Sequence, residues 1–158
     1  MFMIREFQDT DLDRVAEIWL DANQQAHDFI PVGYWKENFP AVKEMLPQAE
    51  VYVYEAETDG EGSNDLLSGR NEIQGFIGLN EEYIEGIFVS SGARSMGGGK
   101  ELMNYVKKKK RKLCLNVYQK NFRAVRFYQR EGFRIEREET DGNTGEKEYL
   151  MIWEDIPG

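Results

Sequence analysis

The apolar positions in the first half of the chain predict two strands separated by helices. Residues 2–7 alternate between apolar and polar types, which is the two-residue period of a half-buried strand. Residues 9–27 show helical spacing instead, and the apolar residues that recur there are Leu12, Val15, Ile18 and Trp19. Residues 34–46 predict one or two short helices broken near Pro40, because proline cannot donate the helical hydrogen bond. Residues 51–56, VYVYEA, predict the second strand.

The second half predicts five more strands and two more helices. The expected strands cover residues 73–79, 83–89, 113–118, 133–140 and 147–154. Helices are expected over residues 100–112 and 122–132, and the latter ends with Gly132 as its C′ residue. The Gly- and Ser-rich segment 58–71 predicts a surface turn that links antiparallel neighbours, and residues 141–145, DGNTG, predict a hairpin turn.

These elements follow the order β-α-α-β-β-β-α-β-α-β-β, without an internal repeat or a long linker. The predicted fold class is therefore mixed α/β (α+β), with helices and strands in one domain. It has a central, mostly antiparallel mixed sheet of about seven strands and four or five helices. We expect residues 1–158 to form a single domain, since domains usually contain ~100–200 residues.

Composition and charge exclude several classes of partner. The chain is 41% hydrophobic and 13% aromatic, which is sufficient for a packed core. Its formal net charge of −9 argues against a nucleic-acid partner, because phosphate contacts require an excess of lysine and arginine. No apolar stretch approaches the ~18 residues of a membrane-spanning helix, so we expect no membrane partner.

The chain contains one cysteine and one histidine. An internal disulfide is therefore impossible, and we expect no metal site, since a zinc centre would need more such ligands. The first residues, MFMIREFQD, lack a basic leader followed by an apolar run. The expected location is the cytoplasm.

Residues 93–100, ARSMGGGK, place three consecutive glycines directly before a predicted helix. A helix N-terminus binds phosphate through its unpaired N–H groups, and glycine lets an anion approach the main chain. The segment fits neither the P-loop, which requires Gly-Lys-Ser/Thr, nor the dinucleotide fingerprint G-x-G-x-x-G. By themselves these glycines could bind phosphate or could form a plain flexible turn.

Segments beyond the glycines resemble the GNAT superfamily of acetyl-CoA-dependent N-acetyltransferases. Residues 88–109, FVSSGARSMGGGKELMNYVKKK, are similar to that family's pyrophosphate-binding segment, and residues 115–133, LNVYQKNFRAVRFYQREGF, to its next strand and helix. Residues 27–35, HDFIPVGYW, and 148–153, EYLMIW, are similar to a bacterial subgroup of small enzymes assigned to protein lysines or unidentified amines. Gly98 departs from the family, which usually has an aliphatic residue there.

The resemblance implies the GNAT fold and acetyl-CoA as cosubstrate. The pantetheine arm would lie along residues 87–89, and the pyrophosphate would bind N–H groups of residues 96–100 beside Arg94. Asn121 would bind the cofactor arm, cap its helix, or both. The implied cofactor-binding residues are Ile87, Phe88, Val89, Arg94, Met96, Gly97, Gly98, Gly99, Lys100, Asn121 and Tyr128. The three strand residues are equally compatible with an ordinary core strand.

The resemblance also suggests catalytic residues. Tyr128 would protonate the leaving thiolate, since a free phenol with a pKa near ~10 is protonated at neutral pH, although its ring could simply pack in the core. Glu85 is a candidate base acting through water, and strict alternation would place it on one face with Ile87 and Val89. Glu81 and Glu82, in the preceding turn, are competing candidates for the base. His27 is a further candidate, because a free imidazole with a pKa near ~6.5 can carry protons, although a loop histidine is more often a surface or hydrogen-bonded residue.

The acceptor side carries aromatic and acidic residues. The candidate substrate contacts are His27, Phe29, Tyr34 and Glu82, and the aromatic residues could instead be core. The acidic residues Glu81, Glu82 and Glu85 favour a cationic amine, such as a lysine side chain or a polyamine.

The expected function is transfer of an acetyl group from acetyl-CoA to a primary amine by direct attack. The alternative is a non-catalytic acyl-CoA-binding sensor on the same fold. The expected partners are acetyl-CoA and an amine acceptor, either a small molecule or a protein lysine, with neither nucleic acid nor membrane. The protein is expected to be a monomer or a homodimer.

Overall fold

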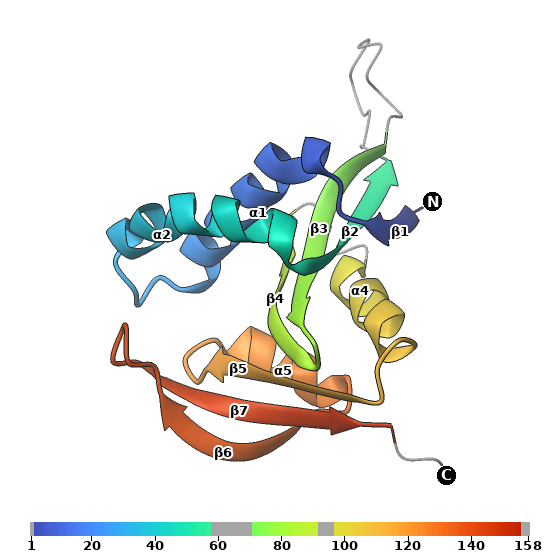
Figure 1. Ribbon diagram of the computed structural model, residues 1–158. Coiled ribbons are helices and arrows are strands. Elements are labelled where there is room, and N and C mark those ends of the chain that lie inside the picture. Colours follow the sequence, from blue (N-terminus) through green and yellow to red (C-terminus); the bar gives the residue numbers. More distant parts are fainter. Residues whose placement is uncertain (1, 58–70, 92–96, 156–158) are drawn as a thin grey trace.

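In the computed structural model the elements follow the predicted order and build one seven-stranded sheet (Figure 1). The structure describes residues 2–57, 71–91 and 97–155. The strands are β1 (Phe2–Glu6), β2 (Glu50–Glu57), β3 (Asn71–Asn80), β4 (Tyr83–Val89), β5 (Lys112–Tyr118), β6 (Arg134–Thr140) and β7 (Lys147–Glu154). The α-helices are α1 (Leu12–Ala26), α2 (Val32–Met45), α4 (Gly98–Lys107) and α5 (Phe122–Arg130). Two 3-10 turns, Asp9–Asp11 and Leu46–Gln48, precede α1 and follow α2.

The strands are arranged in the order β1-β2-β3-β4-β5-β7-β6. Neighbouring strands are antiparallel except β4 and β5, which run parallel. The antiparallel pairing of β2 with β3 confirms the prediction that segment 58–71 links antiparallel neighbours, although most of that segment lies outside the described residues. The predicted fold class is thereby confirmed.

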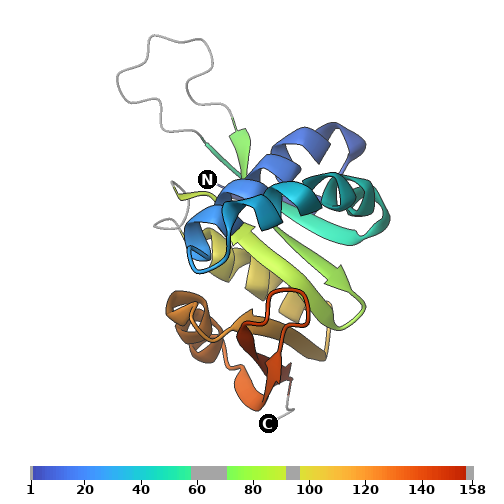
Figure 2. The same cartoon turned by 90° about the vertical axis from the view of Figure 1, so that its left-hand side faces the viewer.

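Helices cover both faces of the sheet, with α1 and α2 on one side and α4 and α5 on the other (Figure 2). On the first face, α1 buries Val15, Ala16 and Ile18 against residues of β2 and β3. On the second face, α4 contributes three side chains with no exposed surface, Leu102, Met103 and Val106. Fully burying such a side chain stabilises the fold by about 1.5–3 kcal/mol, so these two stripes hold the helices on the sheet.

Two predicted helix boundaries are wrong. Pro40 does not interrupt α2, which continues through it to Met45. The proline lies on the exposed side, while Phe39 and Val42 pack against the core on either side of it, so tertiary packing outweighs the missing hydrogen bond. The helix expected to reach residue 112 ends at Lys107, whose ammonium group donates to the carbonyl of Glu131. In contrast, Gly132 has φ of 94° and follows the end of α5, as predicted for a C′ glycine.

In the part of the chain that the structure describes, no helix is both long and apolar enough to cross a membrane.

Candidate functional site

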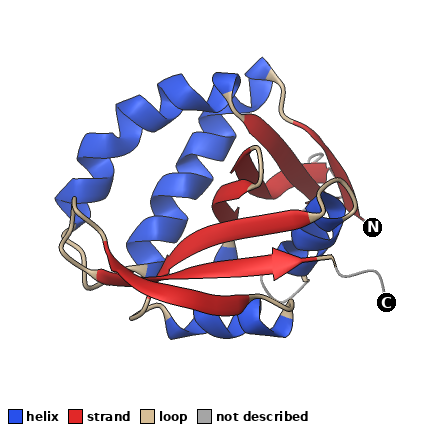
Figure 3. Cartoon of the chain, turned by 60° about the horizontal axis from the view of Figure 1, so that its bottom comes forward, coloured by secondary structure: helices blue, strands red, loops and turns tan. Residues whose placement is uncertain are grey.

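The two halves of the sheet separate between β4 and β5. Within the described strands these neighbours pair at a single position, Tyr83 with Cys114, and the Cys114 amide donates to the Glu82 carbonyl at 3.0 Å. Beyond this point the strands run in different directions (Figures 1 and 3). A cleft of ≈ 1470 Å³ opens there, lined by parts of β4, β5, α1, α4 and α5. Main-chain groups on the open side of β4 can therefore pair with an extended ligand, as a strand would.

Gly97 is the N-cap residue of α4, at one end of this cleft. It adopts the left-handed conformation, with φ of 76° and ψ of 22°, which glycine accepts without strain. A Cβ at Gly97 would meet no atom of the described residues within 4 Å. Gly97, Gly99 and Lys100 line the cleft, which puts the unpaired N–H groups of the helix start beside it. Arg94 and Met96, the other predicted phosphate contacts in this segment, lie outside the described residues.

Gly98 is buried beneath the same turn. A Cβ at Gly98 would lie 3.3 Å from Cε1 of Tyr54 and 3.4 Å from Cγ1 of Val89, closer than side chains usually pack. The Tyr54 ring is only 1% exposed, and Phe2 stacks on it with the ring centroids 5.4 Å apart. An aliphatic side chain at position 98 would therefore require the ring of Tyr54 to shift, whereas glycine does not.

β4 contains a β-bulge at Glu85. The pairs on either side of it are Gly78 with Gly86 and Leu79 with Ile84. Because this extra residue shifts the alternation, Ile84 packs in the same core cluster as Ile87 and Val89. Strict alternation, on which the expected common face of Glu85, Ile87 and Val89 rested, therefore does not hold at this position. Glu85 is exposed and lines the cleft, as do Ile87 and Val89.

The three β4 residues predicted to bind the cofactor are half-buried and line the cleft. Ile87 and Val89 pack on the core under α4, while Phe88 packs on the core under α1, with its ring 5.1 Å from that of Phe76. The core-strand interpretation is thus confirmed for the side chains. Binding through the main chain stays a prediction.

Positive charge lines the part of the cleft that α4 and α5 form. Arg123, Arg126 and Arg130 recur every three to four residues on the exposed side of α5, and they line the cleft together with Lys100. Together with the N-terminus of α4, these four side chains favour an anionic ligand.

Asn121 caps α5 and faces the cleft as well. Its Oδ1 accepts a hydrogen bond from the Ala124 amide at 3.2 Å, which confirms the predicted N-cap. Its Nδ2 lies 3.2 Å from Nε2 of His27, far away in the sequence.

Tyr128 is a core residue whose side chain also reaches the cleft wall. It is 8% exposed, and its ring lies 5.4 Å from that of Phe127 and 5.7 Å from that of Phe133. Burial raises the pKa of the phenol above its usual value, so the hydroxyl group remains protonated at neutral pH. Both interpretations of this residue are therefore compatible: the ring packs, and the hydroxyl group can donate a proton.

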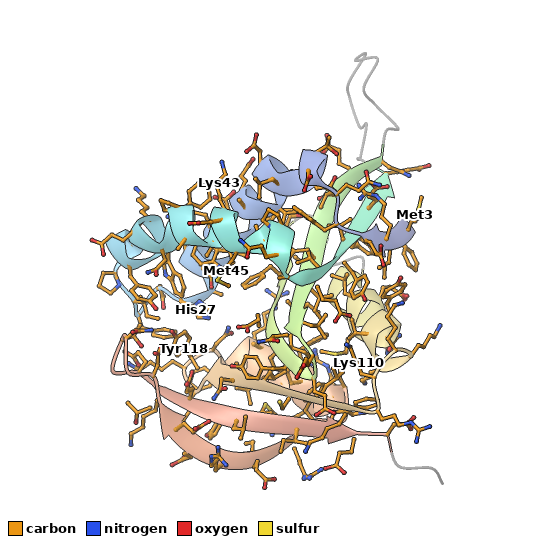
Figure 4. All side chains as sticks on the ribbon, in the orientation of Figure 1. Met3, His27, Lys43, Met45, Lys110 and Tyr118 are labelled. Atoms are coloured by element: carbon orange, nitrogen blue, oxygen red, sulfur yellow. The ribbon has the colours of Figure 1, made fainter. Side chains whose placement is uncertain are left out.

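His27 sits in an aromatic cluster at the end of α1. Its ring stacks on Trp35 at 5.3 Å and meets Phe29 and Tyr118 edge-on at 5.6 and 5.0 Å. Figure 4 shows His27 and Tyr118 close together, between the α1–α2 connection and the end of β5. Burial lowers the pKa of His27 to about 4, so the free-histidine value does not apply and the ring is neutral at physiological pH.

Carboxylates gather near the start of β4, away from the glycine turn. Glu85 and Glu148 both line the cleft, and the pKa of Glu148 is raised by burial and by Asp141 and Glu139. Burial and the charges of Glu85 and Glu148 raise the pKa of Tyr83 to about 12. A cationic group bound here would relieve the repulsion among these carboxylates.

The end of β5 is tied to the β6–β7 turn. The hydroxyl group of Tyr118 donates to Oδ2 of Asp141 at 2.6 Å, and that of Thr144 donates to the same oxygen at 3.0 Å. The predicted DGNTG turn therefore lies beside the aromatic cluster that contains His27. Of these residues, Tyr118 also lines the cleft.

The other predicted substrate contacts do not lie in the cleft wall as the described residues form it. The ring of Phe29 packs edge-on against His27 and Tyr118, which do line the cleft. The ring of Tyr34 packs edge-on against that of Trp35, with the centroids 4.9 Å apart. Glu82 is exposed in the turn before β4. Sequence reasoning missed Glu148 and Tyr118 as site residues, although both lie in segments that resemble the family.

The cleft therefore combines four chemical features. It has a helix N-terminus with basic side chains, an open strand edge, a buried phenol that stays protonated, and a pair of carboxylates. This arrangement suits a long ligand that is anionic at one end and reacts with a cationic partner near the other.

Comparison with known proteins gives a family match. The acetyltransferase (GNAT) domain matches residues 47–135, more than half of the chain. Over 153 residues the chain is 34% identical to the peptidyl-lysine N-acetyltransferase YiaC of Escherichia coli strain K12, with 96% of each protein covered.

Solved structures show the same fold. The solution structure of apo YjaB from Escherichia coli matches with a TM-score of 0.77 and 22% identity, covering 96% of this chain and 97% of that one. The PaiA N-acetyltransferase from Thermoplasma acidophilum, solved in complex with coenzyme A, matches with a TM-score of 0.72 and 16% identity, covering 98% and 99%.

Proposed function

Because the chain belongs to the GNAT family of N-acetyltransferases, we propose that it transfers the acetyl group of acetyl-CoA to the side-chain amine of a lysine in a peptide or protein. The family resemblance inferred from the sequence is confirmed. We treat residues 1–158 as one acetyltransferase domain.

The proposal depends on one observation: the cleft between β4 and β5 has a basic end and an acidic end, joined by the open edge of β4. At the basic end, main-chain N–H groups at the start of α4 would bind the pyrophosphate of the cosubstrate. The arginines of α5 and Lys100 lie where further phosphate charge could be neutralised. Gly97 fits this role, because its left-handed conformation suits glycine and no atom of the described residues would lie within 4 Å of a Cβ there.

Acetyl-CoA supplies an acetyl group that is already activated as a thioester. The main chain of residues 87–89 would hold the arm that carries it and would hydrogen-bond the reacting carbonyl. Tyr128 would donate its phenol proton to the departing sulfur as the C–N bond forms and the C–S bond breaks. Glu85 would accept the proton that the amine loses, acting through water.

Three observations favour a lysine acceptor. Glu85 and Glu148 place negative charge in the cleft, which attracts an ammonium group. The aromatic cluster beside them offers apolar surface for a long side-chain stem. YiaC, the relative that is 34% identical, is named a peptidyl-lysine N-acetyltransferase.

The test is a transfer assay with the purified full chain. Acetyl-CoA would be mixed with lysine peptides, a polyamine and a neutral amine, and both free CoA thiol and the acetylated product would be measured. We expect the fastest thiol release with lysine peptides, and acetylation of the lysine side chain. Activity on the neutral amine alone would contradict the proposed acceptor. Binding of acetyl-CoA without thiol release from any amine would indicate the non-catalytic sensor.

A further inference from the structure

His27 and Asn121 meet across the cleft although 94 residues separate them in the sequence. His27 follows the last residue of α1, and Asn121 precedes the first residue of α5. The contact therefore connects the helix that forms one wall to the helix that carries Tyr128. Because the ring of His27 is held by Trp35 and Tyr118, it is a rigid partner for the amide.

The orientation of the Asn121 amide determines which nitrogen of His27 carries the proton. Oδ1 of Asn121 accepts from the Ala124 amide, so Nδ2 is the group that faces Nε2 of His27 at 3.2 Å. An amide NH₂ group can only donate, so Nε2 must accept and the ring proton must sit on Nδ1. Turning the amide over would break the cap of α5.

This protonation state leaves neither nitrogen of His27 able to remove a proton from a substrate. The lone pair of Nε2 is occupied by Asn121, and Nδ1 already carries a hydrogen. Nδ1 is also buried and has no hydrogen-bond partner among the described residues. A buried donor without a partner is unfavourable, so the surrounding contacts must hold the ring in place.

We propose that His27 is a positioning residue rather than a base: as a neutral imidazole protonated on Nδ1, it accepts a hydrogen bond from Asn121 and thereby holds the first turn of α5 against the aromatic wall. This inference deepens the proposed acetyl transfer and rests on it for its catalytic consequence. Tyr128 lies two helical turns beyond Asn121 on the same short helix, so a displaced first turn would also displace the hydroxyl group.

The first test reads the tautomer directly. The chain has a single histidine, so ¹⁵N NMR of the full chain labelled at histidine gives one imidazole spin system without mutation. We expect Nδ1 to be of the protonated type and Nε2 of the unprotonated type at neutral pH. In Asn121→Asp the carboxylate can still cap α5 but can only accept, so the proton should move to Nε2. A proton on Nε2 in the wild type, or no change in Asn121→Asp, would overturn the proposal.

The second test separates positioning from base catalysis. His27→Phe keeps an aromatic ring on Trp35 but removes the acceptor, and we expect the KM for acetyl-CoA to rise about two- to ten-fold with a smaller change in kcat, as for one neutral hydrogen bond. His27→Gln offers a carbonyl oxygen to Asn121 and should return the KM to within about two-fold of the wild type. A fall in kcat of ~10²–10⁴ in both variants would show that His27 is a base, since an amide cannot replace one.

The outcome does not depend on identifying the acceptor. The dissociation constant of CoA, measured by calorimetry on the same three proteins, should follow the same order as the KM. If no amine is acetylated but His27→Phe still weakens CoA binding and His27→Gln restores it, the proposed function fails while the positioning role stands. If His27→Phe does not fold, the proposal is decided by the histidine tautomer seen in the NMR spectrum and by the calorimetric titration of His27→Gln with CoA.

Discussion

Replacing Tyr128 with phenylalanine removes the proposed acid and leaves the ring that packs in the core. The ring is enclosed by Phe127 and Phe133, and only 8% of the residue is exposed. Phenylalanine has the same shape without the hydroxyl group, so we expect the free energy of unfolding to change by less than about 1 kcal/mol. A loss of activity in Tyr128→Phe would therefore reflect chemistry rather than unfolding.

The expected loss is large because the departing thiolate would have to take its proton from water. General acid catalysis usually contributes ~10²–10⁴-fold. We expect turnover at saturating acetyl-CoA to fall by at least about ten- to a hundred-fold. Burial raises the pKa of Tyr128 above the ordinary value near ~10, so the phenol is protonated throughout the neutral range. Wild-type turnover should accordingly not lose this acid between about pH 7 and pH 9.

The assay is release of free CoA thiol at saturating acetyl-CoA with a lysine peptide. Tyr105→Phe is a matched control, because Tyr105 is a partly buried tyrosine of α4 that packs on Tyr52 and is not part of the cleft wall. The control should keep wild-type turnover. If Tyr128→Phe also keeps it while thermal unfolding is unchanged, Tyr128 is not the acid.

Three further changes test other parts of the account. Gly98→Val would push a side chain into the ring of Tyr54 and should lower the free energy of unfolding by about 1–3 kcal/mol in chemical denaturation, with partial recovery when Tyr54→Leu is added; an unchanged midpoint would contradict the packing argument. Asp11→Asn should cost about 1–3 kcal/mol, because Asp11 is buried and Arg5 donates to it at 2.8 Å. The contact with Arg5 lowers the pKa of Asp11, so its contribution to the free energy of unfolding is complete above about pH 4 and is lost as the pH falls further. The stabilities of the wild type and Asp11→Asn should therefore converge in acid. A stability difference that stays constant with pH would refute this expectation. Glu148→Gln should raise the KM for a lysine peptide several-fold at neutral pH, which corresponds to about 1 kcal/mol or less of binding free energy. Because burial and nearby carboxylates raise the pKa of Glu148, this difference should shrink as the pH falls, beginning above the ordinary glutamate range. An equal KM at neutral pH would exclude Glu148 from acceptor binding.

The fold was predictable because its elements depend on local periodicity. The alternation in β5, where Leu113, Leu115 and Val117 are buried, and the helical stripe of α4 are both visible in the sequence. Pro40 shows where local reasoning fails, because a helix continues through a proline when residues on both sides of it pack against the core. That packing depends on contacts with α1, which is too far away in the sequence to appear in the short stretch of residues from which a helix is predicted.

The cofactor end of the site was more predictable than the acceptor end. Gly97–Lys100 and Asn121 are adjacent to helix starts, so their positions follow from secondary structure. The bulge at Glu85 was not predictable, since the extra residue appears only when β4 is paired with β3. Glu148 enters the cleft through the order of the strands, which places β7 next to β5.

The environment of His27 depends entirely on tertiary contacts. The sequence places an imidazole in a connection between two helices, where an ordinary pKa would be expected. The fold instead surrounds it with Trp35 and Tyr118 and sets its partner, Asn121, 94 residues away. A residue that looked like a proton carrier is therefore neutral in the structure.

The central claim is that the cleft between β4 and β5 binds coenzyme A with its diphosphate at the head of α4. The most direct measurement is an NMR titration of ¹⁵N-labelled protein with CoA, following the backbone amides. The account predicts the largest shifts at Gly97–Lys100 and along residues 87–89. Saturable binding that leaves these amides unmoved, or shifts confined to another surface, would contradict it.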